Sequence, residues 1–220
     1  MVPLSRPIIY PLCLLVGALL TVVAGAAHPD LTGDGAAQLA TIAQCEAWRA
    51  IHFAFSFGFT LSLTGLVGLV GTHVGTPGEG AARAGLIVGG FAYAGWLVVV
   101  AFMAGAGWSL ARSYAAAEPG LAATHAVFVY DMLHPFALAA QRAAGFALGV
   151  STYLFGWGVI NGKVLPRWLG GGAVASGLVA LVLALAFGED TKADQAAFVL
   201  PVVWQLVTAA LMLRGRAAET

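Results

Sequence analysis

The stretch 84-AGLIVGGFAYAGWLVVVAFMAGAG-107 contains 24 consecutive residues without a charged side chain. A helix of this length is about 36 Å long, which is enough to cross the roughly 30 Å hydrocarbon core of a bilayer. The whole chain has the same character, because 60% of its residues are hydrophobic and only 9% are charged. This composition predicts an integral membrane protein.

Six apolar segments are long enough to span a bilayer, and short connections join them. They cover residues 8–27, 50–72, 84–107, 136–160, 168–187 and 196–213. We therefore expect an all-α polytopic transmembrane bundle of about six spans, which forms one integral membrane domain over residues 1–220. The first segment also fits a cleavable signal peptide, since Arg6 precedes it and 24-AGAA-27 ends it, but we expect a retained helix.

Two connections are long enough to form short outer helices. Residues 36–47 follow the turn-like sequence 32-TGDG-35 and lead into the second span. Residues 121–133 lie between 118-EPG-120 and Pro135, and we expect them to form a second helix at the outer interface. Since proline is favourable in the first turn of a helix, the fourth span is predicted to begin at Pro135.

The basic residues predict the orientation of the bundle. The side that carries both termini has six of them, Arg6, Arg83, Lys163, Arg167, Arg214 and Arg216, and the other side has four, Arg49, Arg112, Arg142 and Lys192. The positive-inside rule then places both termini in the cytoplasm of a bacterium, with the protein in the inner membrane. Trp48 and Tyr130 are expected in the outer aromatic belt and Trp168 in the inner one.

Four of the five histidines fall in one outer layer, which also holds Asp30, Asp34, Glu46 and Asp131. These histidines are His28, His52, His125 and His134. One interpretation is that polar residues simply collect where helices leave the bilayer. Another is that the imidazoles bind a cofactor, either a b-type haem, a chlorin or a metal ion of unknown identity, with His52 and His134 as the best pair.

Transport and catalysis have less support in the sequence. Pro201 and Gln205 in the last span could form a kinked transport site, or a packed kink in which Gln205 bonds to a neighbouring helix. The chain contains no nucleophile motif beside Asp131 and His134, so we do not expect an enzyme. Its net charge of zero gives no reason to expect nucleic acid as a partner.

Small residues predict helix packing. Gly85 and Gly89 form a G-x-x-x-G pattern in the third span, and Gly145 and Gly149 form another in the fourth. In a bilayer such positions let helix backbones approach closely. We therefore expect a non-catalytic accessory or scaffold subunit, which binds membrane lipids and other integral membrane subunits through these faces. The rival hypothesis is an electron-transfer subunit that uses the outer histidines.

The chain resembles a group of uncharacterised bacterial six-helix membrane proteins. The resemblance rests on 28-HPDLTGDG-35, 48-WRAIHFAFSFGF-59 and 164-VLPRWLGGGAVASGLV-179, in the order in which they occur. It implies a membrane location and a six-helix fold. It assigns no activity and no site residues.

Overall fold

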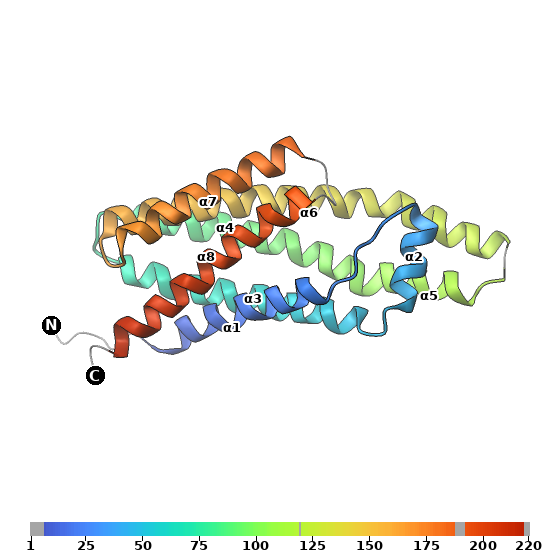
Figure 1. Ribbon diagram of the computed structural model, residues 1–220, viewed down its shortest axis with the longest axis horizontal. Coiled ribbons are helices and arrows are strands. Elements are labelled where there is room, and N and C mark those ends of the chain that lie inside the picture. Colours follow the sequence, from blue (N-terminus) through green and yellow to red (C-terminus); the bar gives the residue numbers. More distant parts are fainter. Residues whose placement is uncertain (1–6, 119, 188–191, 218–220) are drawn as a thin grey trace.

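A bundle of long helices forms the computed structural model, which describes residues 7–118, 120–187 and 192–217, none of them in a strand. Six helices in this part of the chain are long and apolar enough to cross a membrane, and Figure 1 shows them running along one common axis. They are α1 (Ile9–Ala27), α3 (Trp48–His73), α4 (Glu79–Phe102) with its continuation, α6 (Leu121–Gly162), α7 (Arg167–Ala186) and α8 (Lys192–Ala217). The predicted transmembrane helical bundle is confirmed.

The two ends of the bundle differ. α1 begins and α8 ends at the same end, as an even number of spans requires (Figure 1). His28, His52 and His134 lie towards the opposite end, which we call the histidine end. Arg6 and the side chains of Lys192 and Arg216 lie outside the described residues.

The short helix predicted before the second span is present at the histidine end. α2 (Gly35–Gln44) lies across the long helices there (Figure 1). The side chain of Asp34 caps it by accepting a hydrogen bond from Ala37 N at 2.9 Å. Gly33 precedes the cap with φ of 83°, a conformation that glycine adopts without strain.

The prediction that a helix boundary lies at Pro135 is wrong. α6 runs without interruption through Pro135 and is 42 residues long, or about 63 Å. A proline removes one backbone hydrogen-bond donor from a helix. The ring of Pro135 is exposed, so the backbone carbonyl that loses this donor is not buried in the core of the bundle. Residues 121–133 are therefore the first turns of α6 and not a separate helix.

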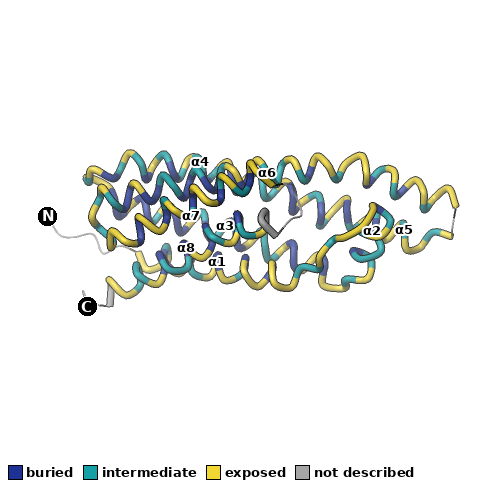
Figure 2. The backbone as a smooth tube through the Cα atoms, turned by 45° about the horizontal axis from the view of Figure 1, so that its top comes forward, coloured by how far each residue is buried: buried dark blue, intermediate teal, exposed yellow. Residues whose placement is uncertain are grey.

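α6 and the helix beside it project beyond the membrane-spanning part at the histidine end. α4 continues through a π-helical turn, η1 (Met103–Gly107), into α5 (Trp108–Ala116), so that 38 residues form one rod. In Figure 2 most of the projecting part of α6 is exposed, and its buried residues Ala126 and Tyr130 belong to the core that α2 and α5 share. A bilayer core of roughly 30 Å covers only about half of either rod.

A hydrophobic core separate from that of the main bundle lies under α2. Trp48 and Tyr130 are fully buried in it, together with Leu39 and Ile42. The prediction that Trp48 and Tyr130 belong to an aromatic belt is therefore wrong, because α2 and α5 cover both side chains. Trp168 is 62% exposed, as expected for a belt residue.

The predicted glycines lie mainly at contacts within the chain. A Cβ atom at Gly89 of α4 would stand 2.8 Å from Ser151 Oγ of α6, and one at Gly85 would stand 3.2 Å from Ser151 O. A Cβ at Gly149 would stand 3.1 Å from the carbonyl of Gly177 in α7, whereas one at Gly145 would meet no atom within 4 Å. Three of these glycines thus serve packing between helices of this chain.

Arg142 joins two helices at the level where the projection begins. Its Nε donates to Ala184 O at 2.8 Å and its Nη2 to Leu185 O at 3.0 Å. These carbonyls belong to the last turn of α7, where the helix leaves carbonyl groups without partners and carries partial negative charge. Arg142 therefore joins α6 to the end of α7.

Gln205 also has a packing role. It lies in α8, which continues through the buried Pro201, and its side chain is 1% exposed. Its amide Nε2 lies 2.8 Å from the hydroxyl of Tyr93 in α4. The pair joins two spans, which favours the interpretation of Gln205 as a packed polar residue over a transport site.

Candidate functional site

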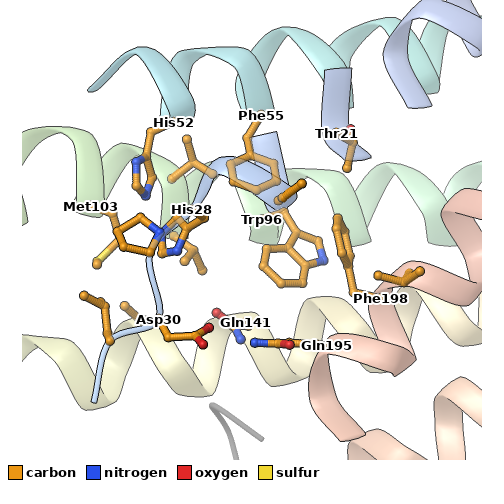
Figure 3. Close-up of a pocket in the computed structure, with 18 of the residues that line it drawn as sticks. Thr21, His28, Asp30, His52, Phe55, Trp96, Met103, Gln141, Gln195 and Phe198 are labelled. Atoms are coloured by element: carbon orange, nitrogen blue, oxygen red, sulfur yellow. The ribbon is translucent and has the colours of Figure 1, made fainter. Parts of the chain in front are cut away.

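A cavity of about 780 Å³ lies at the histidine end, between α1, α3, α4, α6 and α8. This volume falls within the roughly 300–1,000 Å³ typical of small-molecule sites. Figure 3 shows its two ends, with His28 and His52 at one and Trp96 and Phe198 at the other. His52 stands about 32 Å along α3 from its far end at His73, a distance close to the roughly 30 Å thickness of a hydrocarbon core.

Trp48 holds His52 by one hydrogen bond and is itself held by another. His52 Nδ1 lies 2.7 Å from the carbonyl oxygen of Trp48, one turn earlier in α3. A carbonyl only accepts, so Nδ1 carries the hydrogen, and the lone pair of the neutral ring is on Nε2. The indole Nε1 of Trp48 donates to Met103 O at 2.9 Å, in the π-helical turn.

His28 reaches the same place from the end of α1, where it is the C-cap residue. The centroid of its ring lies 5.2 Å from that of His52 and 4.9 Å from that of Trp48. Burial lowers the pKa of the His28 imidazole, against the weaker opposing effects of a hydrogen bond to the Pro29 backbone and the charge of Asp30. His28 is thus more readily neutral than an exposed histidine.

The structure brings three of the four predicted histidines to the cavity. His28, His52 and His134 all line it, but the direct ring contact is between His28 and His52 and not within the predicted pair of His52 and His134. The ring of His134 stacks on Tyr130 at 4.7 Å between centroids. His125 is exposed and is not among the residues that line the cavity.

The apolar end of the cavity was not predicted. Phe55, Phe59, Trp96 and Phe198 line it, and the rings of Trp96 and Phe198 are 4.7 Å apart between centroids. Within the described part of the chain, no acceptor pairs with the buried indole N–H of Trp96. The spacing of residues 52, 55 and 59 places their side chains on one face of a helix, so α3 could have given a signal for this end.

Three further polar side chains lie on one side of the cavity, between its two ends, and we call this the third side. Asp30, Gln141 and Gln195 lie together there (Figure 3). None of the described lining residues is a lysine or an arginine. Nor do the described residues hold a group of three or more histidine, cysteine or acidic side chains placed to bind a metal ion.

Comparison of the chain with known protein families, with curated proteins and with solved structures gives no match. A function for this protein is therefore inferred from the geometry and chemistry of the cavity.

Proposed function

We propose that the protein binds a small, uncharged amphipathic molecule of the lipid phase in the cavity at the histidine end. The observation that carries this proposal is the division of one cavity into a polar end and an aromatic end at the membrane boundary. Polar head groups and apolar bodies of membrane-soluble molecules meet at this depth. A site of this kind suits an accessory subunit that holds a ligand for a larger membrane assembly.

The chemistry of the lining favours an uncharged ligand. A buried anion requires a cationic partner, and the described lining offers none. The histidines, the glutamines and the aromatic rings instead suit a head group that forms hydrogen bonds beside a planar apolar body.

A scaffold role without a ligand has less support from the packing. Gly85, Gly89 and Gly149 were expected to form faces for other subunits, but helices of the same chain occupy the positions beside them. The accessory role proposed here therefore depends on the cavity and not on these glycine faces.

Haem ligation is a second candidate, favoured by one specific contact. Histidines that bind iron commonly donate their other ring N–H to a carbonyl, as His52 does to Trp48. His52 Nε2 would then bind the haem iron. The lack of a described cation for haem propionates is the reason that this candidate ranks second.

The orientation proposed from the sequence agrees with this placement of the cavity. Arg83, Lys163, Arg167 and Arg214 lie at the end opposite the histidines, the end where α1 begins and α8 ends. We propose that this end faces the cytoplasm of a bacterial cell and that the cavity lies at the outer face of the inner membrane.

The experiment that tests the function is the identification of molecules that co-purify with the protein. Wild-type, His52→Leu and His125→Leu proteins are purified in lipid nanodiscs, extracted with organic solvent and compared by mass spectrometry. We expect one lipophilic species at up to one per chain in the wild type and in His125→Leu, and its depletion in His52→Leu. Equal recovery of every species from all three proteins would contradict a site at His52.

The same samples separate the two candidates. An absorption spectrum between about 350 and 900 nm, before and after reduction, shows a Soret band if haem is bound. A Soret band that His52→Leu loses would establish the haem candidate and overturn the proposal of an uncharged lipid.

A further inference from the structure

Both histidines at the polar end present hydrogen-bond acceptors. His52 donates its Nδ1–H to the Trp48 carbonyl, so Nε2 carries the lone pair. A neutral His28 ring likewise keeps a lone pair on one of its two nitrogens. A ligand that satisfies both rings must supply donors.

The third side adds acceptors but no cation. Asp30 offers only acceptor oxygens when it is ionised, and the two glutamines offer both kinds of group. A metal ion is a poor candidate because the described residues do not bring a third ligating side chain to the histidines. Hydroxyl groups are uncharged donors that suit a lipid-soluble ligand.

The aromatic end selects the body that carries those hydroxyls. Phe55, Phe59, Trp96 and Phe198 present ring faces and edges to the cavity, and such walls pack best on a planar ring. A phenolic ring combines a planar body with hydroxyl donors.

The cavity opens sideways between two spans. Val22 of α1 is 40% exposed and Val199 of α8 is 46% exposed, although both line the cavity. Gly25 and Gln195, which also line it, are exposed as well. Figure 1 shows α8 close to α1 at the end where the chain begins and leaning towards α6 at its other end.

From these observations we infer that the ligand is a lipid of the hydroquinone class, with one ring hydroxyl directed at the polar end formed by His28 and His52 and its tail leaving between α1 and α8 into the bilayer. This inference rests on the proposed function and names the class of molecule that the site takes. It involves binding only.

Gly25 provides a way to block the tail without disturbing the helices. A Cβ atom at Gly25 would have its nearest neighbour, Phe55 Cζ, at 3.9 Å, an ordinary van der Waals contact. A leucine there fits the backbone and fills the space beside Phe55 where the tail would pass. Gly71 in α3 is a matched control, because it is exposed and a Cβ there meets no atom within 4 Å.

The test is calorimetric titration of the protein in nanodiscs with decylhydroquinone and with its dimethyl ether. The two probes share ring and tail, but the ether has no donors. We expect one hydroquinone bound per chain and roughly tenfold or weaker affinity for the ether, since each lost hydrogen bond weakens binding by about two- to tenfold. Gly25→Leu is expected to weaken hydroquinone binding at least fivefold, and Gly71→Leu to leave it unchanged.

The outcomes distinguish this inference from the proposed function. Equal affinity for the hydroquinone and its ether in the wild type would overturn the role of the donors, whatever the variants do. Equal binding by Gly25→Leu and the wild type would overturn the sideways exit of the tail. If neither probe binds while a different molecule co-purifies with wild type and not with His52→Leu, the hydroquinone class is wrong and the binding function stands. If neither probe binds and no molecule co-purifies, both are wrong.

Discussion

Replacement of Trp48 by phenylalanine tests the hydrogen bond that joins α3 to the π-helical turn. The variant keeps an aromatic ring but removes the N–H that donates to Met103 O at 2.9 Å. Met103 O keeps the backbone N–H of Trp108 as a donor, so the variant loses one hydrogen bond, about 0.5–1.5 kcal/mol, and the smaller ring adds a cavity cost of the order of 1 kcal/mol. We expect the free energy of unfolding to fall by about 1.5–2.5 kcal/mol.

The assay is reversible unfolding in mixed micelles, followed by circular dichroism. Trp168→Phe is the control, because that side chain is 62% exposed and its replacement is expected to change stability by no more than about 0.5 kcal/mol. If Trp48→Phe lowered stability no more than Trp168→Phe, the hydrogen bond to Met103 would not hold the turn, and the reasoning would be refuted.

Three further predictions concern the packing and protonation of the bundle. Arg142→Met removes two hydrogen bonds to the end of α7 and is expected to lower the free energy of unfolding by roughly 1.5–3 kcal/mol, with only partial recovery in Arg142→Lys. Equal stability of the wild type, Arg142→Met and Arg142→Lys in the same micelle assay would contradict this prediction. Gly17→Ala is expected to destabilise by about 1–3 kcal/mol because its Cβ would stand 2.5 Å from Ser62 N, whereas Gly90→Ala meets no atom within 4 Å and should be neutral in thermal unfolding. Burial lowers the pKa of His28 in the folded protein, so the unfolded chain binds more protons at acidic pH. The free energy of unfolding should therefore be constant above about pH 6.5 and decrease below it. Unfolding curves of His28→Phe should show a smaller decrease of stability at acidic pH.

The six spans could be predicted from the sequence because the bilayer sets a minimum length for an apolar helix. That requirement depends on local composition alone, and the stretch 84–107 meets it without any knowledge of its neighbours. The short helix α2 could be predicted as well, because the turn at 32–35 contains both the cap Asp34 and a glycine that adopts positive φ.

The course of α6 could not be predicted because Pro135 has two compatible outcomes. Proline favours the first turn of a helix, but it also fits inside a long helix where the freed carbonyl is not buried. The same limit applies to Trp48, whose aromatic ring suits a membrane interface and a buried core equally well. Only the position of α2 over Trp48 decides between them.

The site was predicted in part. The histidine layer could be read from the positions at which the spans begin and end, but the partners could not, since the order of helices around a bundle is not encoded in any one span. α1 and α3 are neighbours, and this brings His28 to His52 while His134 contacts Tyr130. Phe198 joins the site only because α8 leans across the bundle.

The most direct test of the central claim is native mass spectrometry of the wild-type protein released from nanodiscs, beside Gly25→Leu and Gly71→Leu. We predict that the wild type and Gly71→Leu each retain one bound molecule per chain after loosely held lipids have been removed, and that Gly25→Leu is largely bare. A wild-type protein that loses every adduct as readily as Gly25→Leu would contradict a binding site in the cavity at the histidine end.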